Sequence, residues 1–165
     1  MVGLRRNETR VGIADAKIIL APDTIMTIGL GSCVGISLHD SIKKITALIH
    51  IMLPDSKAFK SITNKYKFAD LAIPLIIDEM IKMGCKKQNI VAKIAGGASM
   101  FKFSEKSINS DIGIRNIQAV RDAINREGIK IKSEDVGGSK GRTMFAEAET
   151  GKVIIRIVGE GTKEI

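Results

Sequence analysis

The 165-residue sequence is poor in the residues that usually carry chemistry: it has two cysteines, two histidines, one tyrosine and no tryptophan. These numbers exclude a zinc ribbon, a disulfide framework and any site built from many histidines. Cysteine or histidine chemistry is therefore limited to Cys33, His39, His50 and Cys85. The two cysteines lie far apart in the chain, which is typical of free thiols in a reduced, cytoplasmic protein.

Long apolar runs are also missing. The longest, Leu71 to Ile77, is far shorter than the roughly 20 residues of a membrane span. The polar segment Met1 to Arg10 lacks the apolar core of a signal peptide, so we expect a cytoplasmic protein without membrane insertion. A net charge of +8 favours acidic partners. Five phenylalanines and one tyrosine give little material for stacking bases, so we expect no nucleic-acid partner, with a basic nucleic-acid binder kept as an alternative.

The patterns that are present predict one α+β domain over residues 1–165. Apolar residues at helical spacing predict helices from about Tyr66 to Met83 and from about Gly113 to Glu127, with Ile114 on the buried face of the second. Short strands are predicted at 16–20, 24–30, 34–39, 44–52, 90–95, 129–134, 143–149 and 152–158. Because the early strands follow one another without crossover helices, we expect packed, mostly antiparallel β-sheets with outer helices.

The stretch from Thr27 to His50 predicts a β-hairpin that brings two reactive side chains together. A two- or four-residue loop near Asp40 pairs positions whose numbers sum to about 83, which gives one wholly apolar face. The predicted pairs are Val34 with Ile49, Ile36 with Ala47, Leu38 with Ile45 and, on the other face, Cys33 with His50. Directly opposed residues have Cβ atoms about 5 Å apart, so the thiol and the imidazole would interact.

This pair suits nucleophilic catalysis. A histidine beside a cysteine can take its proton, and the thiolate is the nucleophile. The amides of Gly31, Ser32 and Cys33 follow a glycine-rich turn and could form an oxyanion hole. A third group must orient the histidine; the preceding strand has no Asp or Glu, but the Thr27 hydroxyl could accept from the His50 imidazole. Taken singly, Cys33 also fits a small buried residue and His50 a core histidine.

The other reactive residues fit structural positions. His39 ends a predicted strand before a polar turn, so we expect it to be exposed, and Cys85 follows the glycine that ends the first predicted helix. A metal site from the four residues lacks the ligand-pair spacing of known sites. Gly29, Gly31 and Gly35 resemble a dinucleotide fingerprint, but an alternating strand follows where that motif requires a helix. We therefore expect neither a metal nor a cofactor.

Five motifs occur in one order across most of the chain. They are Thr27–Val34 (TIGLGSCV), His50–Ser56 (HIMLPDS), Lys93–Phe101 (KIAGGASMF), Ile112–Asn116 (IGIRN) and Asp135–Gly138 (DVGG). Together they resemble the CheD family, the chemoreceptor glutamine deamidases of bacterial and archaeal chemotaxis. The resemblance implies that Cys33 is the nucleophile, His50 the base and Thr27 the partner of the histidine.

The same resemblance implies a reaction and partners. The cysteine would hydrolyse glutamine side chains on the cytoplasmic helices of methyl-accepting chemotaxis receptors, and the same chemistry extends to glutamyl methyl esters. A CheC-type phosphatase of the response regulator is the second implied partner, and a regulator of that phosphatase with little catalysis is the alternative function. The implied fold is that of the cytotoxic necrotizing toxins. Gly96, Gly97 and Ser99 would form a loop at the substrate site, although loop-forming glycines with a capping serine are a simpler account.

Overall fold

The computed structural model describes residues 5–99 and 111–165. Residues 100 and 101, which end the predicted glycine-rich motif, lie outside this part, as do the first four residues of the basic N-terminal segment. The strands form two five-stranded sheets. The outer sheet has the order β1 (Glu8–Val11), β3 (Thr24–Leu30), β8 (Arg142–Glu147), β9 (Val153–Ile157) and β10 (Gly161–Glu164). The central sheet has the order β2 (Asp15–Leu20), β5 (Ile45–Ile51), β4 (Val34–Asp40), β6 (Ile90–Gly96) and β7 (Lys130–Val136).

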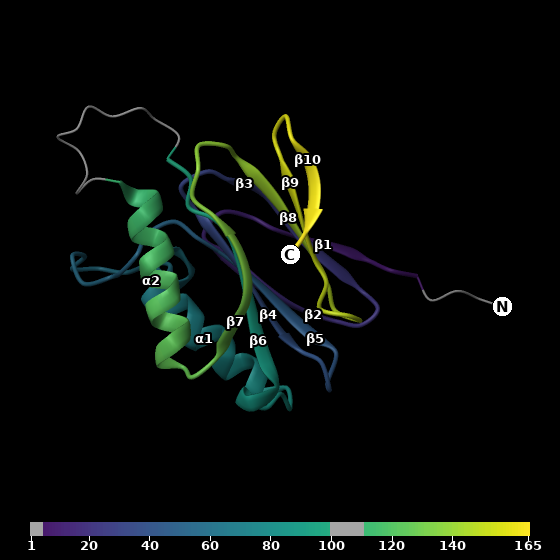
Figure 1. Ribbon diagram of the computed structural model, residues 1–165. Helices are drawn as coiled ribbons and strands as arrows, with labels where there is room; N and C mark the ends of the chain where they lie inside the picture. Colours follow the sequence, from purple (N-terminus) through teal and green to yellow (C-terminus); the bar gives the residue numbers. More distant parts are fainter. Residues whose placement is uncertain (1–4, 100–110) are drawn as a thin grey trace.

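The elements are arranged in three layers, with the central sheet between the outer sheet and two helices (Figure 1). The helices are α1 (Ala69–Lys82) and α2 (Ile112–Arg126), and short 3-10 turns, η1 (Lys65–Lys67) and η2 (Lys87–Asn89), precede α1 and β6. Among the described strands, β1–β3 and β6–β7 pair in parallel and the other neighbours pair antiparallel. The predicted α+β class with mostly antiparallel sheets is therefore confirmed.

Two apolar cores fill the spaces between the layers. The larger core joins the helices to one face of the central sheet through fully buried side chains such as Ile36, Ile73 and Ile124. The smaller core joins the two sheets through Ile25, Leu48 and other apolar residues. The helices cover one face of β4 and β5 and the outer sheet covers the other. Every residue of these two strands is therefore buried. Polar side chains on these strands therefore need partners inside the protein.

The helix predictions hold to within a few residues. Each helix is followed by a glycine with positive φ, Gly84 at 99° and Gly128 at 71°, as C-terminal caps require. The prediction for Ile114 is wrong, because it lies in the first turn of α2 on the side away from the sheet and is 61% exposed. Strands β1 and β10 were not predicted, since both are short and largely polar. Among the described residues, no helix is long and apolar enough to cross a membrane.

The hairpin of β4 and β5 is present, but the predicted register is wrong by two residues. Gly35 is the residue that pairs with His50, and the paired numbers sum to 85 throughout. A shift of two positions keeps each side chain on its predicted face, because strand side chains alternate with a period of two. Cys33 therefore still lies on the His50 side of the hairpin, one position before β4 and diagonal to the histidine rather than opposite it.

The turn explains the shift. The ladder continues to the pair Asp40–Ile45, so the loop contains four residues and begins one position later than predicted. The Asp40 carboxylate accepts hydrogen bonds from the amides of Ile42 at 2.9 Å and Lys43 at 3.0 Å. Lys44 then closes the turn in the left-handed region, with φ of 53°. Local hydrogen bonding of the aspartate thus selects this loop over an alternative that has the same pattern of apolar residues.

Candidate active site

A hydrogen-bonded chain fixes the imidazole of His50. The Thr27 hydroxyl donates to the carbonyl oxygen of Val11 at 2.7 Å, and its oxygen lies 2.7 Å from His50 Nδ1. Since the one hydroxyl proton is used toward Val11, the bond to the ring must be donated by Nδ1–H. His50 is therefore neutral with its proton on Nδ1, and its Nε2 carries the free lone pair.

His50 is a neutral imidazole in the folded chain and not a cation. The residue is fully buried, and burial lowers its pKa to about 4. Nε2 is also buried and has no hydrogen-bond partner among the described residues. The lone pair of Nε2 is therefore not engaged by any described residue and is available to accept a proton.

Cys33 is half-buried at the start of β4, packed against the core between the two sheets. Burial raises the pKa of its thiol, and a hydrogen bond from its own backbone N–H offsets part of that rise. The resting cysteine is therefore a neutral thiol. The backbone N–H of Cys33 is close to its own sulfur, so it can donate to the oxyanion that forms on a carbonyl oxygen when that sulfur attacks.

The hairpin brings the thiol and the imidazole to one region. Cys33 and His50 belong to the same face and to diagonal positions of neighbouring strands. Diagonal neighbours are about 7–8 Å apart at the backbone, within reach of a ring as long as imidazole. This face of the hairpin is turned toward the outer sheet, where Cys33 packs against the core between the two sheets.

The loop before Cys33 is held by backbone hydrogen bonds on both sides. Gly31 N–H donates to the Gly29 carbonyl at 3.0 Å, so that amide is already used. The Gly31 carbonyl accepts from Ala98 N–H at 2.8 Å, and the Cys33 carbonyl accepts from Gly97 N–H at 2.8 Å. Because the Gly31 N–H is already bonded, the amides of Ser32 and Cys33 are the two donors left for the predicted oxyanion hole.

Gly96 permits the closest approach at the site. It has φ of 110°, and a Cβ at this position would lie 2.2 Å from the Cys33 carbonyl oxygen. Only glycine satisfies both conditions. The glycines of this motif thus act by letting β6 and the loop after it pass directly against the backbone of Cys33.

Comparisons with known proteins agree with this geometry. Residues 52–157 match the family described as CheD chemotactic sensory transduction. The chain belongs to the CheD family. A probable chemoreceptor glutamine deamidase CheD of Clostridium botulinum (strain Eklund 17B / Type B) is 57% identical over 162 residues, which cover 98% of this chain and all of the relative. The protein of the same name from Clostridium novyi (strain NT) is 54% identical with the same coverage.

One solved structure is also similar. The Bacillus licheniformis hypothetical protein YfiH has a TM-score of 0.42 and 13% identity, covering 70% of this chain and 46% of its own. A likeness at this level supports no conclusion about this CheD chain. The family match begins at residue 52, after Thr27, Cys33 and His50. The roles of these three residues therefore rest on the geometry described above and on the motifs that contain them.

Ser99 of the predicted substrate loop bonds within the protein. Its hydroxyl donates to the Asp111 carboxylate at 2.5 Å, and its amide donates to the Gly138 carbonyl at 2.9 Å. Asp111 in turn caps α2 by accepting from the Ile114 amide. Ser99 thus connects the glycine motif to the start of α2, and Gly97 contacts the Cys33 backbone directly.

An ion pair between Arg142 of the outer sheet and Asp135 of the central sheet lies beside the same loop, and the sequence did not predict it. Arg142 Nε donates to Asp135 Oδ2 at 3.0 Å, and both side chains are largely buried. Burial acts to raise the pKa of Asp135, but hydrogen bonds from Lys163 and Arg142 outweigh it and hold the pKa below its usual value. Next to this pair, Gly137 N–H donates to the Gly96 carbonyl at 2.9 Å.

The prediction that His39 is exposed is wrong, since it is 5% exposed. Its Nδ1 lies 2.7 Å from Thr46 Oγ1, and the turn at Gly151 packs on the ring so tightly that a Cβ there would lie 2.3 Å from it. Sequence reasoning missed this because the covering turn lies in the other sheet. Cys85 is buried beside Asp40, and burial and that carboxylate raise the pKa of its thiol to about 11. Cys85 is thus an unreactive structural thiol.

Asn116, the last residue of the Ile112–Asn116 motif, holds two backbone segments together, which the sequence did not predict. It is fully buried on the face of α2 that carries Ile117 and Val120. Its Nδ2 donates to the carbonyl oxygens of Ser32 and Met52, each at 2.9 Å. A polar residue in an otherwise apolar helix face was the signal in the sequence that could have identified it.

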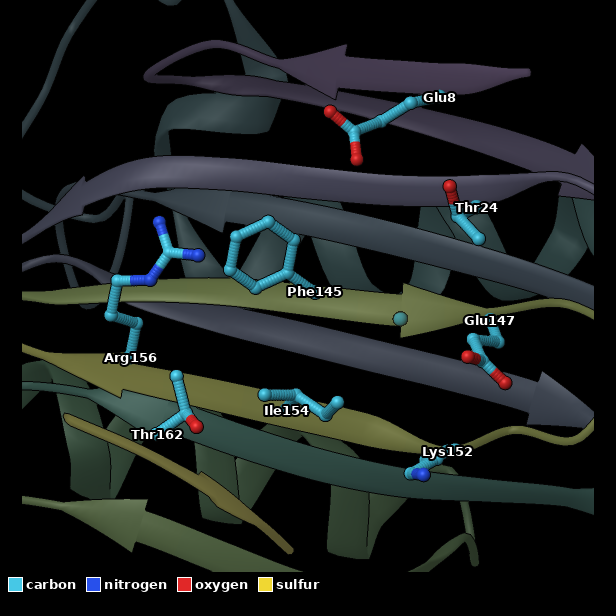
Figure 2. A pocket seen from close by; sticks show the side chains of 9 residues that line it. Glu8, Thr24, Phe145, Glu147, Lys152, Ile154, Arg156 and Thr162 are labelled. Atoms are coloured by element: carbon cyan, nitrogen blue, oxygen red, sulfur yellow. The ribbon is translucent and has the colours of Figure 1, made fainter. Parts of the chain in front are cut away.

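A hollow of about 340 Å³ lies on the outer sheet, and neither Cys33 nor His50 lines it. Phe145, with Arg156 stacked at 5.0 Å from its ring centroid, and Glu8 belong to its lining (Figure 2). Thr24 also lines it, whereas Thr27, an odd number of positions along the same strand, faces the opposite side toward His50. This hollow therefore cannot present a substrate to the thiol.

Proposed function

We propose that this chain is a chemoreceptor glutamine deamidase in which Cys33 is the nucleophile, His50 the general base and Thr27 the group that orients the histidine. The observation that carries the proposal is the bond between Thr27 Oγ1 and His50 Nδ1, which leaves Nε2 as an unused acceptor on the face that holds Cys33. Orientation of a base through its second nitrogen is the arrangement that nucleophilic triads share.

The first half of the reaction forms a thioester. His50 Nε2 takes the Cys33 proton as the sulfur attacks the side-chain carbonyl carbon of a receptor glutamine. The carbonyl oxygen becomes an oxyanion, which the amides of Ser32 and Cys33 stabilise. The tetrahedral intermediate then expels the nitrogen, and the imidazolium gives it the proton, so that ammonia leaves and a glutamyl thioester of Cys33 remains.

The second half releases the product. His50 Nε2 takes a proton from water, and the hydroxide attacks the thioester carbon. The sulfur leaves and recovers its proton from the imidazolium, which restores Cys33 and yields glutamate. A glutamyl methyl ester would enter by the same route with methanol as the leaving group, so receptor methylesterase activity is part of the proposal.

Two observations support a chemoreceptor as the substrate. The relatives are named probable chemoreceptor glutamine deamidases, and the net charge of +8 favours acidic protein surfaces. We expect the reaction in the cytoplasm, where the modified receptor helices lie. A CheC-type phosphatase is a further proposed partner, supported by the motif resemblance, and titration of its rate with this chain tests that interaction.

The test is mass spectrometry of a cytoplasmic receptor fragment incubated with the purified chain. Each conversion of an amide to an acid by hydrolysis adds about 1 Da. We expect this change with the wild-type chain and with Cys85→Ala, which removes the cysteine remote from His50, and none with Cys33→Ala. Persistent deamidation by folded Cys33→Ala would exclude the proposed nucleophile.

A further inference from the structure

Asn116 connects the two segments that carry the catalytic pair. Its Nδ2 donates at 2.9 Å to the carbonyl of Ser32, the residue before Cys33, and at 2.9 Å to that of Met52, two residues after His50. Ladder pairing between β4 and β5 ends at Val34 and Ile51, so both carbonyls lie just beyond the sheet. The side-chain amide of Asn116 thus joins the two chain segments just beyond the point where backbone hydrogen bonds between β4 and β5 end.

The carbonyl oxygen of the Asn116 side chain makes no hydrogen bond with any described residue. Asn116 is fully buried, and its Oδ1 has no hydrogen-bond partner among the described residues. A buried acceptor without a partner destabilises the folded state. An apolar residue would suit this helix face without that cost, because Ile117, Val120 and Ile124 occupy the rest of it. The site therefore retains asparagine for its two donated bonds.

Within residues 5–99 and 111–165, no other hydrogen bond joins these two segments from the side of the helices. On the opposite side, Gly97 N–H donates to the Cys33 carbonyl and Ala98 N–H to that of Gly31. These bonds fix the nucleophile loop to β6, whereas the Asn116 bonds fix it to the end of the His50 strand. Of the described residues, Asn116 is the one whose side chain bridges both.

We infer that Asn116 is a positioning residue that sets the distance and angle between the Cys33 thiol and the His50 imidazole. The inference rests on the proposed function, since it assigns a role relative to that pair. Without the two bonds, the Ser32 carbonyl and the Met52 carbonyl separate, and the thiol moves relative to Nε2. A displacement of about 1 Å in such a pair lowers the rate on the order of 100-fold.

The primary test compares Asn116→Ala with wild type in two assays. With a receptor fragment, kcat falls on the order of 100-fold while KM changes little, because the bonds position the nucleophile and not the substrate. Without a receptor, alkylation of Cys33 by iodoacetamide is measured against pH. Wild-type Cys33 reacts faster than the variant at each pH, because His50 Nε2 takes the thiol proton during attack on the reagent. The variant shows the slower rate, and the roughly tenfold rise per pH unit, of an unassisted thiol.

Alkylation of Cys85, measured in the same reactions, is an internal control for unfolding. It is 3% exposed and reacts only when the fold opens, so peptide mapping separates loss of positioning at Cys33 from loss of stability. Thr46→Val is the matched control variant, because it removes a buried hydrogen bond, to His39, at the far end of the same hairpin. It should lower stability and leave kcat and the Cys33 profile unchanged.

Each outcome decides the inference. A folded Asn116→Ala chain with wild-type kcat and a wild-type alkylation profile overturns it. If this variant unfolds, as uniform alkylation of Cys85 would show, Asn116→Ser is measured in its place, and the same unchanged profile overturns the inference. The alkylation assay needs no receptor, so it tests Asn116 even where Cys33→Ala still deamidates receptors and the proposed function fails.

Discussion

Thr27 Oγ1 lies 2.7 Å from His50 Nδ1 and donates its own proton to the carbonyl of Val11, also at 2.7 Å. The threonine is in β3 of the outer sheet and the histidine in β5 of the central sheet, so the bond spans the interface between the two sheets. It fixes the tautomer of His50 through a neutral group where many triads use a carboxylate. Since a neutral partner does not raise the basicity of the imidazole, burial alone determines its low pKa.

Thr27→Val tests this relationship. Valine has nearly the same shape but accepts no hydrogen bond, so Nδ1–H loses its partner and the ring loses its fixed tautomer. We expect kcat to fall on the order of 100-fold, as for removal of general-base function. Thr27→Ser keeps the hydroxyl and should retain most activity. Steady-state kinetics on a receptor fragment measures both, and equal kcat for Thr27→Val and wild type would contradict the assignment.

The pH dependence of kcat/KM follows from the two buried groups. Burial lowers the pKa of His50 to about 4 and raises that of Cys33. The reactive form, neutral imidazole with neutral thiol, therefore persists from roughly pH 5 to 8, and the rate should be flat across that range. An inflection near the ordinary histidine pKa of about 6.5 would show instead that His50 titrates as an exposed ring.

Stability should fall on the acid side for the same reason. The pKa of His50 is lowered from 6.5 in the unfolded chain to about 4 in the folded one. As the pH drops through this window the unfolded state binds a proton that the native state does not, which costs on the order of 3 kcal/mol once complete. Urea unfolding at pH 7 and pH 4 measures the effect.

Two variants isolate the contribution of each histidine to this acid sensitivity. His50→Gln should lose less stability between pH 7 and pH 4 than wild type does. His39→Gln serves as the comparison, because burial also lowers the pKa of His39, while the nearby Asp40 opposes that shift. If His50→Gln keeps the full wild-type loss, other groups must account for the acid sensitivity.

Gly96→Ala should disrupt both stability and activity. The new Cβ would lie 2.2 Å from the Cys33 carbonyl oxygen at φ of 110°, so we expect a loss of about 3 kcal/mol from steric overlap together with backbone strain. Gly128→Ala is the matched control, since it has a φ of 71° with no atom within 4 Å of the added carbon. Thermal unfolding of the two variants separates overlap from strain, and equal losses would show that the close approach to Cys33 is unimportant.

Much of the architecture could be predicted because it depends on local patterns. The helix C-termini follow from Gly84 and Gly128, and the buried faces follow from the spacing of apolar residues. The register of the hairpin could not be predicted, because a slip of two residues leaves the same side chains on each face. The hydrogen bonds from the turn amides to the Asp40 carboxylate select one of these registers. The exposed position of Ile114 depends on how α2 is rotated against the sheet, which its own sequence does not specify.

The sequence by itself determined which residues are available for the reaction. With two cysteines and two histidines, strand alternation places Cys33 and His50 on one face for any hairpin loop with an even number of residues, because side chains repeat every two residues. Only the tertiary structure decided how they work. Packing of the outer sheet brings Thr27 to Nδ1 of His50, covers His39, and buries His50 fully and Cys33 in part, while α2 supplies Asn116. These contacts join segments far apart in the chain, and their geometry is set by the packing of whole layers rather than by any local preference.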